Sequence, residues 1–363
     1  MSGKATPYSA LPATAYWRTG VAEPGPWGLA GLWRSRWALP ADARFSTYGS
    51  CFAQHISRAL VARQMAWIDA EPAPARMPDA VAKAFNYGIF SSRTANIYTA
   101  RQLLMLTEMA SGDMNPALPE IWTEKGRAFD SLRPTIEPNG FKSIEEAQLS
   151  RLSMVRAFRR SITNADVFIF TLGLTEGWEN AETGQAYAIC PGTVAGEFDA
   201  RVHRFRNYGF VEIRSDLESA FALMRAINPD LRILLTVSPV PLTATASGQH
   251  VLVATTRSKS VLRAVAGEIV EADPNTDYFP SYEIITGAPT RAMFFEPNMR
   301  SVAPQGVEFV MRHFFAGLDL TAGARAGLAV RIDYNEAETR IEKEAAAEDV
   351  VCEEIALEAH NRA

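Results

Sequence analysis

Two adjacent side chains that can act as nucleophiles, Ser50 and Cys51, lie in the stretch FSTYGSCFAQHI at residues 45–56. An apolar run, a glycine and apolar positions at helical spacing predict a strand, a turn and the start of a helix there. At the first turn of a helix, the dipole and the unpaired amides lower the pKa of a thiol, which favours Cys51 as a thiolate nucleophile. Ser50 is expected to cap the helix instead, by accepting a backbone N–H. The alternative for Cys51 is simple packing, because cysteine is among the most often buried residue types.

The remaining elements must position this turn. Apolar patterns predict buried strands at residues 44–48, 165–174, 229–242 and 276–285. Amphipathic patterns predict helices at residues 51–67, from about 99, and at 144–163, 216–228, 258–272 and 305–318. Such alternation predicts an α/β fold with a doubly wound, mostly parallel sheet. Sites in that architecture lie at the carboxyl ends of strands, where Gly49-Ser50-Cys51, Gly173-Leu174-Thr175 and Ser238-Pro239 occur.

The composition narrows the classes of protein. The 363 residues are 47% hydrophobic and 21% charged, which is typical of a globular domain. The sequence lacks an apolar run of the roughly 20 residues that a membrane span needs, and its first residues lack the apolar core of a signal peptide. We therefore expect a cytoplasmic protein with no membrane span. Three scattered cysteines predict neither a disulfide framework nor a metal site, and we expect no metal or other cofactor.

Charge and composition divide the chain into three parts. Residues 1–43, rich in Pro, Gly, Ala and Trp, predict an arm laid over the surface and pinned by aromatic side chains. Residues 44–318 hold the α/β pattern, and residues 319–363 form an Ala/Glu-rich, helix-prone tail. From Arg331 onward there are ten acidic and four basic residues, whereas the whole chain carries a net charge of −5. The tail is therefore a solvated segment or a helix that docks on a protein partner, and nucleic acid is an unlikely ligand because no basic stripe is present.

Five ordered motifs resemble those of a known family. They are YGSCFA (48–53), TLGLTEGW (171–178), TVSPVPLTAT (236–245), SKSVLRA (258–264) and YFPSYEI (278–284). The chain resembles the GSCFA family over residues 44–316. That family looks like a branch of the SGNH (GDSL-type) hydrolases, which implies a flavodoxin-like sheet. The resemblance further implies esterase, polysaccharide deacetylase or acyltransferase activity, with a link to surface-polysaccharide synthesis.

The resemblance also implies roles for individual residues. Gly49-Ser50-Cys51 matches the Gly-Asp-Ser motif of SGNH enzymes, which places Cys51 at the nucleophile position. An oxyanion hole would combine the N–H of Cys51 with that of Gly88, and Thr175 stands where the family pattern has Asn. Gly173, in the same block as Thr175, is a further candidate. The alternative for Gly88 and Gly173 is that each is an ordinary turn glycine.

One departure from the superfamily concerns the general base. SGNH enzymes carry Asp-x-x-His before the last helix, where this chain has Asn298 and Ser301. Among the five histidines, His250 follows a predicted strand at the carboxyl edge and is the candidate base, whereas His55 shares a helix face with Cys51. A Cys-His pair would suit acyl transfer, because a thiolate needs less help from a base than a hydroxyl does. A purely structural role for each histidine is the alternative.

Charged residues near the strand ends complete the candidate site. Glu176 and Glu283 could orient a histidine, or form surface salt bridges. Lys259 and Arg257 could bind an anionic substrate such as a sugar acid, or lie on a solvated helix face. In the substrate-binding set we therefore include Glu176, Lys259 and Arg257.

Together these features predict an acyltransferase or esterase that acts on a carbohydrate or glycoconjugate. Cys51 would accept the acyl group from an acyl donor, and a sugar hydroxyl or water would then receive it. The missing Asp-x-x-His pair leaves a second hypothesis open, in which a degenerate SGNH-like protein binds glycan or scaffolds a complex without turnover.

Overall fold

The computed structural model describes residues 6–320, 356 and 357. At its centre is a five-stranded parallel sheet with the spatial order β3, β2, β6, β10, β11. Its strands are β2 (Arg44–Gly49), β3 (Ala66–Trp67), β6 (Val167–Leu172), β10 (Arg232–Val237) and β11 (Thr276–Phe279). The expected α/β architecture with a central parallel sheet is confirmed. The chain first moves to one side of β2 and then to the other, so the carboxyl ends of β2 and β6 form the switch point where such sheets place ligands.

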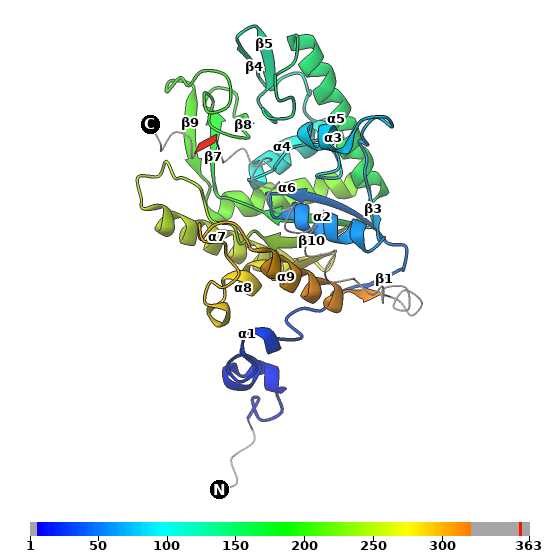
Figure 1. The fold of residues 1–363 in the computed structure, drawn as a ribbon, viewed down its shortest axis with the longest axis vertical. Coiled ribbons are helices and arrows are strands. Elements are labelled where there is room, and N and C mark those ends of the chain that lie inside the picture. The colour runs from blue at the N-terminus through cyan, green and yellow to red at the C-terminus, as the bar shows by residue number, and fades with distance from the viewer. Residues whose placement is uncertain (1–5, 321–355, 358–363) are drawn as a thin grey trace.

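Helices cover both faces of the sheet (Figure 1). One face carries α4 (Ala100–Ser111), α5 (Ile144–Asn164), α6 (Phe210–Ile227) and α7 (Val251–Ala272). The other carries α2 (Ala53–Ala62), α8 (Ser281–Thr286) and α9 (Pro304–Gly317). Strand β6 shows the two-sided burial directly, because Phe168 and Phe170 enter the first core while Val167 and Ile169 enter the second.

Local sequence signals fix the start of two predicted helices. Thr99 Oγ1 accepts the N–H of Gln102, and Gln102 Oε1 accepts the N–H of Thr99 at 2.9 Å, which is a capping box at the start of α4. Helix α4 ends at Ser111 and is capped by Gly112, whose φ is +100°. Ser143 caps α5 by accepting the N–H of Glu146 at 3.2 Å. Both helices begin where the sequence predicts them.

Two predicted elements give way to a different element before their expected end. The helix predicted over residues 51–67 ends at Ala62, because Gln64 takes a left-handed φ of +55°, and the chain then forms β3. Val61, one of the apolar positions at helical spacing in this segment, is 50% exposed. The strand predicted at residues 276–285 ends at Phe279, since Pro280 has no N–H for the ladder, and α8 follows.

Two antiparallel additions lie outside the predicted strands and helices. A hairpin of β4 (Ile121–Glu124) and β5 (Arg127–Asp130) packs against α5, with the short α3 (Asp79–Ala84) nearby in Figure 1. A three-stranded sheet has β7 (Glu176–Asn180) between β8 (Ala186–Tyr187) and β9 (His203–Asn207), and β8 packs against α4. Their short, polar strands do not show the apolar alternation from which strands are predicted.

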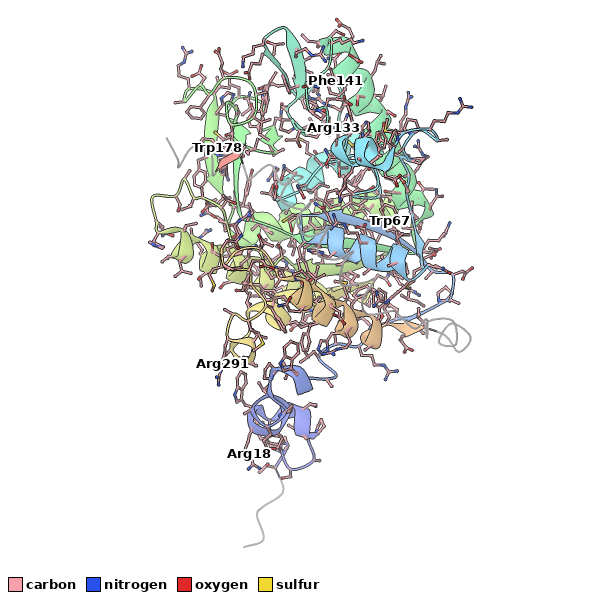
Figure 2. The ribbon with its side chains drawn as sticks, viewed as in Figure 1. Arg18, Trp67, Arg133, Phe141, Trp178 and Arg291 are labelled. Carbon is pink, nitrogen blue, oxygen red and sulfur yellow. The ribbon has the colours of Figure 1, made fainter. Side chains whose placement is uncertain are left out.

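The N-terminal residues divide into a projecting part and a pinned part. The segments η1 (Ala13–Ala15), η2 (Arg18–Ala22) and α1 (Gly25–Gly28) project from one end of the molecule (Figure 1), where Figure 2 labels Arg18. Beyond them, Trp33 stacks on Phe314 with ring centroids 5.8 Å apart. Strand β1 (Ala38–Leu39) pairs with β12 (Asp319–Leu320). The expected aromatic pinning is thus present at Trp33. It also holds α1, because the ring of Trp27 contacts the rings of Phe294 and Phe309 with centroids 5.4 Å and 5.6 Å apart.

Two further features complete the described chain. A short turn of helix, η3 (Ala288–Thr290), follows α8. Almost all of the tail predicted at residues 319–363 lies outside the described residues.

Candidate functional site

The end of β2 is locked against β6 by a glycine. Gly49 has a φ of +132°, and a Cβ there would lie 2.3 Å from the carbonyl oxygen of Thr171. Immediately after it, the N–H of Ser50 donates to that same oxygen at 3.1 Å. Only glycine therefore fits at residue 49, and the turn that follows is held at the carboxyl end of β6.

Ser50 and Cys51 both lie in the turn between β2 and α2. Helix α2 begins at Ala53, and the backbone N–H of Ala53 donates to the carbonyl of Ser50 at 2.9 Å. Ser50 is 3% exposed and Cys51 is 7% exposed. The prediction that the Ser50 side chain caps α2 is wrong, because Ser50 Oγ makes no hydrogen bond to any other residue that the structure describes. The two residues precede the helix, with buried side chains.

Gly173, at the end of β6, packs directly on this turn. A Cβ at Gly173 would lie 3.1 Å from Ser50 Cβ and 2.9 Å from the carbonyl oxygen of Tyr98. The N–H of Leu174 donates to that Tyr98 oxygen at 2.8 Å, and the N–H of Ile97 donates to the carbonyl of Gly49 at 2.9 Å. Three segments therefore meet at the switch point: the turn after β2, the loop after β6, and the residues just before α4.

The contribution of Ile97 and Tyr98 is missing from the sequence analysis. The sequence feature that points to these two residues is the capping box at Thr99. A helix that begins at residue 100 places the residues before it in the loop that reaches the edge of the sheet. Ala95, just upstream, is buried with a left-handed φ of +57°, which is uncommon for a residue with a Cβ. Only the structure reveals that conformation.

Gly88, the other predicted oxyanion glycine, lies in a different environment. It is exposed, with a φ of +68°, and a Cβ there would have no described atom within 4 Å. Gly173 is buried against Ser50. The structure therefore brings Gly173, and not Gly88, into contact with the Ser50–Cys51 turn.

Thr175 is fully buried and its hydroxyl is engaged. Its Oγ1 donates to Asn207 Oδ1 at 2.8 Å, and its backbone N–H donates to Ser258 Oγ at 3.0 Å. Arg257 also donates to Asn207 Oδ1. A hydroxyl has a single proton to donate, so Thr175 would have to leave Asn207 before it could stabilise an oxyanion.

Glu176 is a buried carboxylate beside this group. Its Oε1 accepts a hydrogen bond from Thr245 Oγ1 at 2.8 Å and a longer one from Asn207 Nδ2 at 3.4 Å. Burial raises the pKa of Glu176 above its ordinary value, although Thr245 and the charge of Arg257 act in the opposite direction. Asn207, Thr245 and Ser258 extend the predicted site. Thr245 and Ser258 belong to two of the five motifs named above, whereas Asn207 lies outside those motifs and outside the predicted strands and helices.

The other predicted charged residues divide between the interior and the surface. Lys259 is 1% exposed, and its Nζ donates to the carbonyl oxygen of Gly173 at 2.7 Å. It therefore lies behind the loop after β6, not on a solvated helix face. Glu283 is exposed and forms an ion pair with Arg263 at 2.5 Å. Of the two roles considered for Glu283, this is the surface salt bridge.

The structure places His250 at the start of α7, on the surface. Its Nδ1 accepts the N–H of Leu252 at 3.2 Å, so His250 caps this helix. Lys259, which reaches Gly173, lies nine residues later, or roughly 13 Å along a helix axis. His55, in α2, is buried with its ring against Phe52. The two histidine candidates are thus separated: His250 lies on the surface, and His55 lies in the helix that follows the Ser50–Cys51 turn.

Asn298 and Ser301 form a turn of their own. Asn298 Oδ1 accepts the backbone N–H groups of Arg300 and Ser301, each at 2.9 Å. Asn298 Nδ2 donates to Ser301 Oγ at 3.0 Å. An amide and a hydroxyl bonded in this way stabilise the turn, and neither side chain can serve as a histidine base does.

The fold and this junction define a doubly wound α/β protein with a candidate site at its switch point. The GSCFA family model matches residues 44–314, from the start of β2 into α9, and the chain belongs to the GSCFA family. A search of curated proteins returned no match. In the described part of the chain, no helix is long and apolar enough to cross a membrane. Over those same residues, no group of three or more His, Cys, Asp or Glu side chains is placed to hold a metal ion.

Proposed function

We propose that the protein is an SGNH-like acyltransferase or esterase that acts on a carbohydrate or glycoconjugate through an acyl-enzyme at Cys51. The observation that carries the proposal is the packing of Gly173 on the Ser50–Cys51 turn at the switch point. The strand order supports it, because β3-β2-β6-β10-β11 is the 2-1-3-4-5 order of flavodoxin-like sheets. By default, the reaction would take place in the cytoplasm.

The proposed chemistry has two steps. The Cys51 thiolate attacks the carbonyl carbon of the donor, a carbon–sulfur bond forms, and the leaving alkoxide departs and takes up a proton. An acceptor hydroxyl then attacks the thioester carbon and loses its proton, and the thiolate leaves. His250 is the candidate proton shuttle and would act through Nε2, since its Nδ1 caps α7. Because it lies on the surface at the start of α7, it would exchange protons with the site through water.

An oxyanion forms in both steps and needs hydrogen-bond donors. The backbone N–H of Gly173 donates to no other residue in the described part of the chain, and Gly173 contacts Ser50, the neighbour of Cys51. It is therefore the donor that the site supports best. The nearby polar side chains of Glu176, Asn207 and Thr245 suit an acceptor with several hydroxyl groups.

Trapping of the acyl-enzyme tests the proposal. We expect a small activated ester, such as p-nitrophenyl acetate, to leave one acetyl group on the wild-type protein and on Ser50→Ala, and none on Cys51→Ala, as read by intact mass. Cys190→Ala is the matched control, because burial raises the pKa of the Cys190 thiol to about 11 and keeps it protonated. An adduct that persists in Cys51→Ala but is lost in Ser50→Ala would contradict the thiolate assignment.

A second candidate is a glycan-binding or scaffolding protein without turnover. The turn made by Asn298 and Ser301 favours it, because the acid–base pair of an SGNH enzyme is missing there. Saccharide binding by calorimetry, together with no acyl adduct in any variant, would support this candidate over the enzyme. A protein partner that binds the C-terminal tail belongs to the same proposal.

A further inference from the structure

Three consecutive residues of α7 hold the loop after β6. Ser258 Oγ accepts the N–H of Thr175 at 3.0 Å, and Lys259 Nζ donates to the carbonyl of Gly173 at 2.7 Å. Arg257 Nη1 lies 3.5 Å from Thr175 Oγ1. Residues from one turn of α7 therefore form hydrogen bonds with both ends of the Gly173-Leu174-Thr175 segment.

These contacts fix the backbone on both sides of the Gly173 N–H. The peptide unit between Gly173 and Leu174 is bound at its oxygen by Lys259 and at its nitrogen by the carbonyl of Tyr98. The preceding unit is bound at the Leu172 oxygen by the N–H of Ser238 at 2.9 Å. A donor whose neighbouring groups are all fixed needs no reorganisation when charge develops nearby, which is the condition for an effective oxyanion donor.

The choice of lysine at this buried position needs a physical reason. Lys259 is 1% exposed, and removing an ammonium from water is costly even when it is hydrogen-bonded. A carbonyl in a loop can instead be bound by a neutral donor at lower cost. The feature that only a lysine or arginine supplies is positive charge. Here the charged group binds the carbonyl of Gly173, and Gly173 in turn packs on Ser50, the neighbour of Cys51.

We propose that Lys259 is a positioning residue with an electrostatic role: it orients the Gly173 amide, and its charge favours the thiolate of Cys51. A cation near a thiol lowers the pKa of the thiol. The inference builds on the proposed function, but it makes a claim about Cys51 that can be measured without turnover.

The test is the pH dependence of Cys51 alkylation by iodoacetamide, followed by mass spectrometry of the peptide that contains Cys51. In Lys259→Met we expect the profile to move to higher pH and the rate at pH 7 to fall about tenfold, which corresponds to one pKa unit. Lys259→Gln keeps a donor for the Gly173 carbonyl without the charge, so we expect the same shift with a smaller loss of acylation rate. It also carries the test if the methionine variant does not fold. Lys125→Met, at a lysine whose side chain is 89% exposed, should behave as wild type.

The outcomes separate this inference from the proposed function. A folded Lys259→Gln or Lys259→Met protein with the wild-type alkylation profile would overturn the role of Lys259. A shifted profile without any acyl adduct in the wild type would leave the role of Lys259 intact and refute the acyl-enzyme instead.

Discussion

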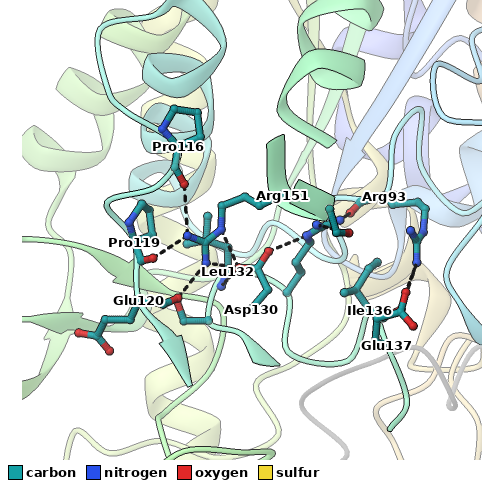
Figure 3. A network of polar contacts seen from close by, with 12 residues as sticks. Arg93, Pro116, Pro119, Glu120, Asp130, Leu132, Ile136, Glu137 and Arg151 are labelled. Atoms are coloured by element: carbon teal, nitrogen blue, oxygen red, sulfur yellow. Dashed lines mark hydrogen bonds and ion pairs between the residues drawn. The ribbon is translucent and has the colours of Figure 1, made fainter. Parts of the chain in front are cut away.

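Two buried polar regions of this molecule differ in how completely their groups are hydrogen-bonded. One is the network of Asp130, Arg133 and Arg151, of which Figure 3 labels Asp130 and Arg151. Asp130 accepts bonds from both arginines, whose side chains are 0% exposed. Arg151 also donates to the backbone carbonyls of Pro119 and Glu120. At the switch point, three side-chain atoms have no hydrogen-bond partner among the residues that the structure describes: Ser50 Oγ, Thr171 Oγ1 and Gln54 Nε2.

The difference indicates different purposes. The network around Asp130 joins the β4–β5 hairpin to α5, and its saturated bonds are what a buried charged cluster requires to be stable. Buried polar atoms without hydrogen bonds, as at the switch point, destabilise the folded state and form no contact that stabilises it. We interpret the first region as an anchor and the second as a site that is held ready for a ligand.

The largest expected effect is at the anchor. Burial alone would raise the pKa of Asp130, yet Arg151 and Arg133 hold it below its ordinary value. Replacement of Arg151 by Met leaves this carboxylate under-compensated, so we expect a loss of about 3–5 kcal/mol in the free energy of unfolding, measured with urea. Arg201→Met, at an exposed Arg–Asp pair, should leave the free energy of unfolding close to that of the wild type. Equal losses in the two variants would show that the buried network is not an anchor.

The opposite result is expected at the switch point. Ser50→Ala removes a buried hydroxyl that has no described hydrogen-bond partner, so we expect unchanged stability or a gain of up to about 1 kcal/mol. Ser57→Ala is the matched comparison in the same region, because Ser57 Oγ contacts Thr47 Oγ1 at 3.0 Å and the carbonyls of Ala53 and Ile89. We expect its loss to cost about 1–3 kcal/mol. If Ser50→Ala destabilises as much as Ser57→Ala, the contrast between the two regions is wrong.

Much of the fold follows from sequence patterns. The unbroken apolar run at β6 and the capping signals of α4 and α5 specify elements that the structure confirms. The two-residue strand β3 and the polar strands β7 and β9 have no such signal, since their pairing depends on neighbours distant in sequence. Short range periodicity does not record that information.

The site is predictable to a smaller extent. Its strand-end motifs identify Gly49 and Gly173, because a close approach of two backbones requires glycine at these positions. The motifs do not predict how side chains are oriented. The Thr175 hydroxyl donates to Asn207, and the Lys259 ammonium points inward and donates to the carbonyl of Gly173. Both outcomes depend on which segments pack behind the loop, and a linear pattern does not contain this.

The smallest expected effect is a change in how the free energy of unfolding depends on pH. Burial raises the pKa of Glu176, so the folded protein binds the proton of this carboxyl group more tightly than the unfolded chain does. The stability of the wild type therefore falls as the pH rises from the ordinary glutamate pKa through the raised pKa. Glu176→Gln removes this dependence, so its stability relative to wild type should increase with pH in urea titrations. Asp199→Asn is the control of opposite sign, because Arg201 lowers the pKa of Asp199 to about 2 and the variant should lose relative stability as pH rises toward the ordinary aspartate range. A flat difference for Glu176→Gln would mean that the hydrogen bonds and the charge of Arg257 fully offset the cost of burying this carboxylate. The distinction between anchor and site would then rest on Ser50 alone.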